Sequence, residues 1–164
     1  MLTPRKTQLE LIQSKIYTAD SIRPMLLYWR FKDEKIVFTN GCFDIIHRGH
    51  IDYLCKAADC GTQLIIGLNS DDSVRRLQKG PSRPLQDEQS RALILAALHF
   101  VSAVVCFNED TPYDLIKQIQ PDVLVKGSDY KIEQIAGHDL VKEVKLIDFL
   151  PGYSTSGIER KIKG

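Results

Sequence analysis

Short runs of apolar residues alternate along the chain with longer amphipathic stretches. Each short run is nearly continuous in Val, Ile, Leu and Phe, which is typical of strands that are buried on both faces of a sheet. The predicted strands are residues 35–39, 63–68, 103–107, 123–126 and 145–150. The predicted helices are residues 49–60, 72–78, 88–100, 112–119 and 132–141, with one more after Ser154. This alternation predicts an α/β fold: a five-stranded parallel sheet with helices on both faces.

The first 32 residues carry a helical pattern that precedes the first predicted strand. Their apolar positions fall on the faces of two amphipathic stretches: Leu9, Ile12, Ile16, Ile22, Leu26 and Trp29. We therefore predict a helical appendage over residues 1–32, packed on the sheet or on a second subunit, and a main domain over residues 33–164.

Composition narrows the class of protein. The 164 residues are 43% hydrophobic, and 22 Lys and Arg against 21 Asp and Glu leave a formal charge of only +1. This balance argues against a general nucleic-acid or membrane-surface binder. The four cysteines, at positions 42, 55, 60 and 106, form no CxxC pair, which favours free thiols in a reducing cytoplasm.

Neither a signal peptide nor a membrane segment is expected. Arg5, Lys6 and Glu10 interrupt the apolar pattern of the N-terminus. The longest apolar stretch, residues 93–107, is broken by His99 and Ser102 and is shorter than the roughly 20 residues that a spanning helix needs. We therefore expect a cytoplasmic protein.

The most informative segment is TNGCFDIIHRGH at residues 39–50, which follows the first predicted strand and opens the next helix. Ligands of open α/β sheets bind where strands end and helices begin. Gly41 allows a close approach of the backbone to a ligand, and Gly49 leaves the N–H groups of the helix start accessible to an anion. His47 and His50 are three residues apart, so both imidazoles can point toward the same phosphate. Neither GxGxxG nor GxxxxGK[ST] occurs, which disfavours the usual dinucleotide and P-loop sites.

Two other interpretations of the histidine pair remain open. One histidine could simply cap the helix while the other is a surface residue, although HxGH at a strand-to-helix turn favours a phosphate site. A zinc site would need a third ligand, for which Cys42 or Asp44 could serve, but zinc helices more often space their histidines four residues apart.

The segment KGPSRP at residues 79–84 is either a mobile substrate cover or a plain connector. Its Gly and Pro residues resist regular structure, and Lys79 and Arg83 give it positive charge. Composition alone favours the connector.

The motif HRGH, with TNGCFD before it and STSGI near the end, resembles the HxGH nucleotidyltransferase superfamily. The stretches NSDDSVRRLQKGPSRP, EDTPYDLI, PDVLVKGSDY and LPGYSTSGI further resemble the heptose-1-phosphate adenylyltransferase group. The likeness covers nearly the whole chain from residue 35 to residue 162. It implies a Rossmann-like fold and the transfer of AMP from ATP to D-glycero-D-manno-heptose 1-phosphate, which yields ADP-heptose and pyrophosphate for lipopolysaccharide core synthesis.

The resemblance also assigns roles to individual residues. His47, His50 and Lys79 would be catalytic and stabilise charge on the triphosphate, and Asp44 would hold Mg²⁺ or orient the incoming phosphate. The other residues implied to bind the nucleotide or its phosphates are Thr39, Gly41, Phe43, Gly49, Arg91, Lys126, Gly127, Asp129, Ser154 and Thr155. The expected partners are ATP, Mg²⁺ and a sugar 1-phosphate, in a homodimer.

The chain departs from the group's pattern in two places. Ser128 stands where the group usually has a second glycine, and the connection at residues 141–145 is short. Two alternative functions are kept: a cytidylyltransferase acting on glycerol 3-phosphate or a similar alcohol phosphate, because that group shares HxGH and the STS-like ending, and a module that senses a nucleotide without turnover.

Overall fold

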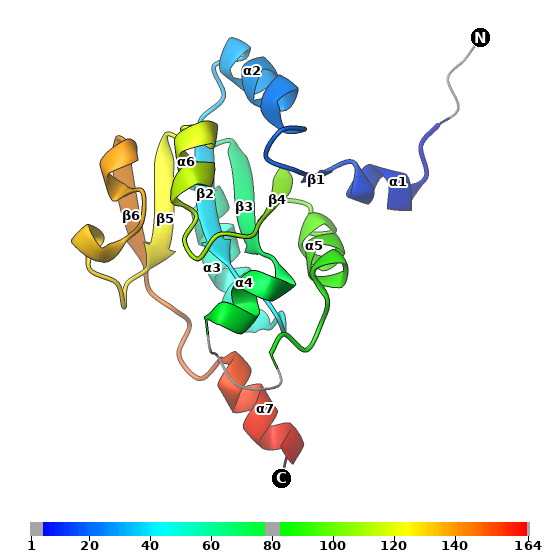
Figure 1. Cartoon of the computed structure of the whole chain (residues 1–164), viewed down its shortest axis with the longest axis vertical. Coiled ribbons are helices and arrows are strands. Elements are labelled where there is room, and N and C mark those ends of the chain that lie inside the picture. The colour runs from blue at the N-terminus through cyan, green and yellow to red at the C-terminus, as the bar shows by residue number, and fades with distance from the viewer. Residues whose placement is uncertain (1–4, 78–82, 164) are drawn as a thin grey trace.

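A computed structural model describes residues 5–77 and 83–163 of the chain (Figure 1). Its centre is a parallel sheet of six strands in the order β1-β4-β3-β2-β5-β6. The strands are β1 (Ile16–Tyr17), β2 (Ile36–Gly41), β3 (Gln63–Asn69), β4 (Ala103–Phe107), β5 (Val123–Gly127) and β6 (Glu143–Ile147). From β2 the chain runs outward to β3 and β4, and then crosses back to place β5 and β6 on the other side of β2. This is the doubly wound order of Rossmann-like folds.

Seven α-helices and two 3₁₀ helices are described. The α-helices are α1 (Gln8–Gln13), α2 (Arg23–Phe31), α3 (Arg48–Ala58), α4 (Asp71–Arg76), α5 (Glu88–Ala96), α6 (Tyr113–Ile119) and α7 (Thr155–Lys163). The 3₁₀ helices are η1 (Ile132–Gln134) and η2 (His138–Leu140). No helix of the described residues is both long enough and apolar enough to cross a membrane.

Two hydrophobic clusters cover the two faces of the sheet. Because successive strand residues point to opposite faces, Leu64 and Ile66 pack with α3 and α5, whereas Ile65 between them packs with α2 and α6. These strand side chains are at most 2% exposed. The prediction of a sheet with helices on both faces is confirmed.

The predicted number of strands was wrong: the structure has six strands, whereas five were predicted from the sequence. The extra strand comes from the N-terminal segment: Ile16 and Tyr17 of β1 pair with Val104 and Val105 of β4. Two residues are too few to show the alternation that identifies a strand, so the periodicity of the flanking helices concealed it.

Two further elements differ from the prediction. The expected helix over residues 132–141 is instead η1 and η2, separated by Gly137 at φ +85°, a left-handed conformation that no α-helix contains. The last strand begins at Glu143, two residues before its expected start, and ends at Ile147. It lies at the edge of the sheet and is only partly buried, so its apolar pattern is weak.

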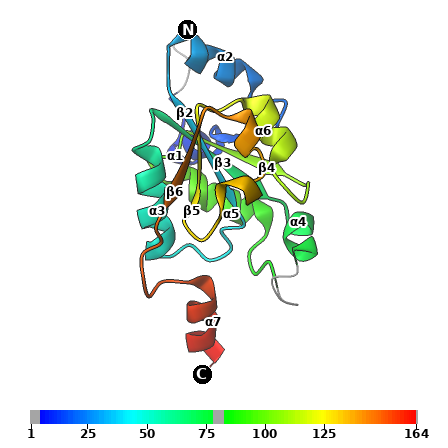
Figure 2. The ribbon, with the colours of Figure 1, turned by 90° about the vertical axis from the view of Figure 1, so that its left-hand side faces the viewer.

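Helix α7 extends beyond the rest of the molecule. In both views it lies at the end opposite α2, past the edge where the central strands end (Figures 1 and 2). None of the side chains described for residues 155–162 is buried. The helix therefore buries little apolar surface against the rest of the chain.

Candidate active site

The candidate site lies at the carboxyl ends of β2 and β5, where the direction of winding reverses. Their paired register is limited to Val37 with Val123 and Phe38 with Leu124. Both strands continue for three more residues, to Gly41 and Gly127. The last three residues of the two strands are thus not paired with each other, and such a switch point is the crevice in which open α/β sheets bind ligands.

The turn between β2 and α3 brings the HxGH histidines together. His47 is the N-cap of α3, and its Nδ1 accepts the backbone N–H of His50 at 3.3 Å. The two imidazoles stack with their centroids 3.9 Å apart, and the ring of Phe43 lies 5.4 Å from that of His50. Burial lowers the pKa of His47 from its usual value, which favours the neutral form of this ring. Because Nδ1 accepts, the proton of the neutral ring is on Nε2, which can donate to a phosphate oxygen.

Close packing explains the two glycines of this turn. A Cβ on Gly41 would lie 2.9 Å from the ring of Phe43, which itself has a left-handed φ of +46°. A Cβ on Gly49 would lie 3.0 Å from the Cβ of Tyr153 and 3.1 Å from the ring of His47. The side chain of Tyr153, the second residue before α7, thus lies directly against the backbone at Gly49.

Asp44 fixes the segment before α5 onto this turn. Its buried carboxylate accepts the backbone N–H groups of Leu85 and Gln86 at 2.8–2.9 Å and the guanidinium of Arg83 at 2.9 Å. Burial raises the pKa of Asp44, but these donors outweigh it and hold the pKa below 3.8. Both oxygens are occupied, and a direct bond to Mg²⁺ would compete with these hydrogen bonds. The metal role of Asp44 stays a prediction.

Arg91 is fully buried and faces protein atoms. Its guanidinium donates to the carbonyls of Gln86 at 3.0 Å and Cys42 at 2.7 Å, and to the carboxylate of Asp71 at 2.7 Å. In this structure Arg91 therefore joins the end of β2 to the starts of α4 and α5. The expected contact between Arg91 and a nucleotide would require part of this network to open.

The end of β5 supplies a second group of the predicted residues. Lys126 donates to the side chain of Asn40, near the end of β2, and its Nζ lies 5.6 Å from the centroid of the Tyr130 ring. A Cβ on Gly127 would lie 2.3 Å from the ring of Phe149 and 2.6 Å from a carboxylate oxygen of Asp129. Glycine is therefore needed where the half-exposed Phe149 crosses the strand end.

Thr39 lies in the core beneath this crevice. It is 0% exposed, and its hydroxyl is 2.8 Å from that of the buried Tyr53. Burial and the nearby charge of Asp129 raise the pKa of Tyr53 to about 12, against the lowering effect of the Thr39 hydrogen bond. Thr39 thus supports the floor of the site through α3.

The start of α7 closes one side of the site. The Ser154 hydroxyl accepts the backbone N–H of Gly157 at 3.0 Å, which caps the helix that begins at Thr155. Beside it is an open hollow of about 700 Å³ lined by Gly152, Tyr153, Ser154, Gly157, Arg160 and Lys161. Two cations and a capped helix start suit a phosphate group.

The structure groups most of the predicted residues but not all of them. Lys79 lies outside the described residues. Sequence reasoning missed Tyr53, Arg160 and Lys161, and it noted Arg83 only as a charge in a connector. The Tyr53 and Arg83 contacts join positions 14 and 39 residues apart, which no local pattern indicates.

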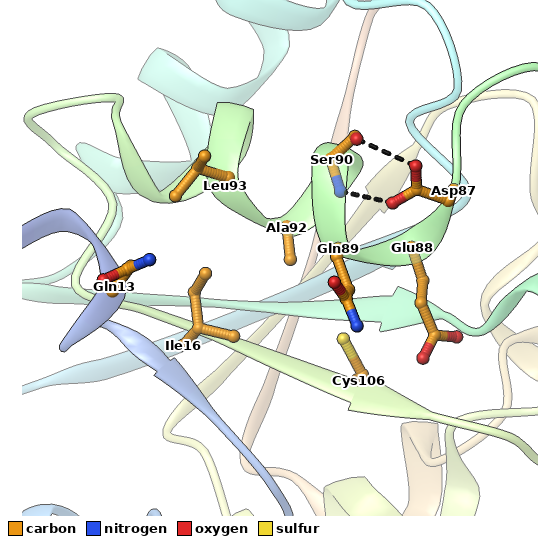
Figure 3. A pocket seen from close by; sticks show the side chains of 9 residues that line it. All are labelled: Gln13, Ile16, Asp87, Glu88, Gln89, Ser90, Ala92, Leu93 and Cys106. Carbon is orange, nitrogen blue, oxygen red and sulfur yellow. Dashed lines mark hydrogen bonds between the residues drawn. The ribbon is translucent and has the colours of Figure 1, made fainter. Parts of the chain in front are cut away.

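A second cavity, of about 420 Å³, lies between the N-terminal segment and α5 (Figure 3). Gln13 and Ile16 line it from the N-terminal segment, Glu88 and Leu93 from α5, and Cys106 from β4. Burial raises the pKa of the Cys106 thiol to about 11, so it is not a reactive thiolate at neutral pH. No residue of the HxGH turn lines this cavity.

No metal cluster is found within the part of the chain that the structure describes: no three His, Cys, Asp or Glu side chains are grouped to hold an ion.

A doubly wound sheet with stacked HxGH histidines at its switch point defines a nucleotidyltransferase-type domain. A family model described as Cytidylyltransferase-like matches residues 38–159, and the chain belongs to this family. The resemblance to HxGH nucleotidyltransferases is thereby confirmed.

Known relatives are proteins named Bifunctional protein HldE. The protein from Wolinella succinogenes is 57% identical over 152 residues, which are 93% of this chain and 32% of the relative. The protein from Methylobacillus flagellatus is 53% identical over 152 residues, which are 90% of this chain and 31% of the relative. The chain thus spans about a third of the length of these relatives.

Solved structures share the fold. The lipopolysaccharide core biosynthesis protein from Thermoplasma volcanium is 27% identical with a TM-score of 0.61, over 71% of this chain and 99% of that one. The pantoate-beta-alanine ligase from Francisella tularensis has a TM-score of 0.56 at 17% identity, over 90% of this chain and 76% of that one. The second likeness concerns the fold alone.

Proposed function

We propose that this chain is an adenylyltransferase that joins AMP from ATP to D-glycero-D-manno-heptose 1-phosphate, giving ADP-heptose and pyrophosphate. The observation that carries the proposal is the stacked His47–His50 pair at the start of α3, at the switch point of the sheet. Membership of the Cytidylyltransferase-like family supports nucleotidyl transfer. The heptose substrate is supported by the sequence likeness to the heptose-1-phosphate group and by relatives named HldE. A lipopolysaccharide core biosynthesis protein also shares the fold at 27% identity.

The reaction we propose is a single in-line displacement. An oxygen of the sugar phosphate attacks the α-phosphorus of ATP, and the bond from that phosphorus to the bridging oxygen of the β-phosphate breaks. Pyrophosphate leaves with the bonding electrons. The attacking phosphate is already anionic, so no covalent intermediate or strong base is needed, and positioning and charge stabilisation supply the rate.

Different residues of the site would bind or stabilise different parts of the substrates. The Nε2–H of His47 and the His50 ring would stabilise the charge that builds on the α-phosphate, together with the N–H groups at the start of α3. The start of α7, with Ser154, Thr155 and Arg160, would bind the leaving phosphates. Gly127 and Asp129 would border the ribose and base.

We expect Mg²⁺ to act with ATP. When bound it neutralises phosphate charge, and it keeps several water ligands rather than requiring a cage of protein side chains. The sparse carboxylates of the described site fit this mode.

Because ATP is a cytoplasmic substrate, we infer that the protein works in the cytoplasm. The homodimer stays a prediction that light scattering on the purified chain would test.

The decisive experiment is a pyrophosphate-release assay on the purified chain. ATP, CTP, GTP and UTP are each combined with heptose 1-phosphate, glycerol 3-phosphate and other sugar phosphates in the presence of Mg²⁺. We expect turnover with ATP and heptose 1-phosphate only. His50→Ala should release pyrophosphate about 10²- to 10³-fold more slowly, and His99→Ala, which changes an exposed histidine outside the site, serves as the matched control. Preference for CTP would refute adenylyl transfer, and binding of ATP without any release would support the sensing module.

A further inference from the structure

Helix α7 carries part of the candidate phosphate site but contributes little to the core. None of its described side chains is buried, and Ile162 is 75% exposed. Figures 1 and 2 show that it projects from the edge of the sheet. A helix with so little apolar burial has a low cost of local opening, so its position depends on specific polar contacts.

Arg83 makes such a contact from the segment before α5. Its Nη2 lies 2.8 Å from a carboxylate oxygen of Glu159 in α7, and its Nη1 lies 2.9 Å from a carboxylate oxygen of Asp44. The side chains are only 10% exposed for Arg83, 22% for Glu159 and 4% for Asp44. Ion pairs shielded to this degree are screened less by salt than pairs on an open surface.

Asp44 continues the connection into the HxGH turn. The side chain of Gln86 donates to the backbone carbonyl of Asp44 at 2.6 Å. The carboxylate of Asp44 accepts the backbone N–H groups of Leu85 and Gln86. Three residues later in the chain, His47 caps α3. One guanidinium thus joins α7 to the turn that carries the histidines.

We propose that Arg83 is a positioning residue that holds the start of α7, with Ser154 and Thr155, against the HxGH turn by pairing with Asp44 and Glu159 at once. The inference deepens the proposed function, on which its kinetic part rests. Arg83 would act through the placement of α7 and not by touching the reacting atoms.

The chemistry of arginine suits this task. The planar guanidinium presents donors on two sides in fixed directions, so one side chain can pair with two carboxylates. A lysine has a single ammonium on a flexible stem and cannot match both partners at these distances. Burial lowers the pKa of Arg83, but hydrogen bonds to Asp44 and Glu159 outweigh it and raise the pKa above its usual range, so the guanidinium stays charged.

The test compares Glu159→Gln and Arg83→Lys with the wild type. Glu143→Gln is the matched control, because it is the same substitution at another ion-paired glutamate, in β6 and bonded to Lys35 and Lys145. Hydrogen–deuterium exchange of the α7 amides is measured without ligand, with the amides of β2 and β3 as the reference for global stability.

We expect the α7 amides to exchange about 3- to 10-fold faster in Glu159→Gln and in Arg83→Lys, as the net loss of one ordinary hydrogen bond predicts. The double variant should show no further increase in exchange rate, because both changes break the same contact, between residues 83 and 159. The β2 and β3 amides, and all amides of Glu143→Gln, should keep their wild-type rates.

A kinetic arm separates positioning from folding. The kcat/KM for ATP should fall about 3- to 10-fold in both variants, chiefly through a rise in KM, because α7 would bind the leaving phosphates, which are charged in bound ATP as well as in the transition state. Unchanged α7 exchange, or equal acceleration throughout the sheet, would overturn the proposal. If the wild type releases no pyrophosphate, the proposed function fails, while the exchange measurement still decides whether Arg83 positions α7.

Discussion

Replacing Arg91 with methionine tests whether this buried arginine supports the fold or binds the nucleotide. Methionine keeps much of the length and apolar volume of the side chain and removes all five N–H donors. The change leaves the carbonyls of Cys42 and Gln86 and the carboxylate of Asp71 without the donors that they have in the structure. If Arg91 is mainly structural, the loss appears in the free energy of unfolding.

The structure gives the size of the effect. The Arg91 side chain is 0% exposed and that of Asp71 is 23% exposed, so the pair is largely shielded from water. Breaking a buried pair by removing one partner costs about 3–5 kcal/mol. In a chain of 164 residues each 1 kcal/mol lowers the Tm by about 2–4 °C, so we expect a fall of roughly 6–20 °C.

Urea unfolding followed by circular dichroism measures this loss. Arg76→Met is the control, because Arg76 pairs with Asp110 at 2.7 Å but the two side chains are 45% and 71% exposed. We expect that control to lose less than about 1 kcal/mol. An Arg91→Met protein of near wild-type stability with strongly weakened ATP binding would refute the structural role and favour the direct nucleotide contact.

Three further predictions address the site. Tyr53→Phe should cost about 1 kcal/mol in urea unfolding, since it removes the buried hydrogen bond to Thr39; an unchanged midpoint would contradict this. The lowered pKa of Asp44 means that its carboxylate stabilises the fold fully above pH 3.8, and that this contribution is lost as the pH falls through the lower folded value. Asp44→Asn should therefore flatten the pH dependence of unfolding between about pH 5 and about pH 2. His50→Ala should lower kcat about 10²- to 10³-fold with little change in KM for ATP, and a folded variant with wild-type kcat would remove the basis of the mechanism.

The sequence predicted the central strands because they are buried on both faces and read as continuous apolar runs. Ile65 illustrates this, since its neighbours on either side in β3 are also buried, against the opposite face. The two-residue strand β1 was not predicted, because its pairing with β4 depends on tertiary contacts rather than on a local pattern. The helix predicted over residues 132–141 failed because Gly137 adopts a left-handed conformation there.

Some residues of the candidate site could likewise be predicted from the sequence, and others could not. The HxGH turn could be predicted, because its glycines and histidines follow a strand end within a few residues. The environments of Asp44 and Arg91 could not, because most of their partners lie 20 to 49 residues away and are brought together only by the tertiary fold. Residue identity shows that a charge is present, but its partners decide whether it is free to meet a ligand.

His47 shows why the structural and functional interpretations of a residue need not compete. As the simpler interpretation expects, it caps α3, with Nδ1 accepting the N–H of His50. That same contact fixes the tautomer, since a neutral imidazole that accepts at Nδ1 must carry its proton on Nε2. The stacked ring of His50 then limits the orientation of His47. Capping therefore orients the Nε2–H donor that a phosphate oxygen requires. The free-energy cost of orienting this donor arises on folding and not during the reaction.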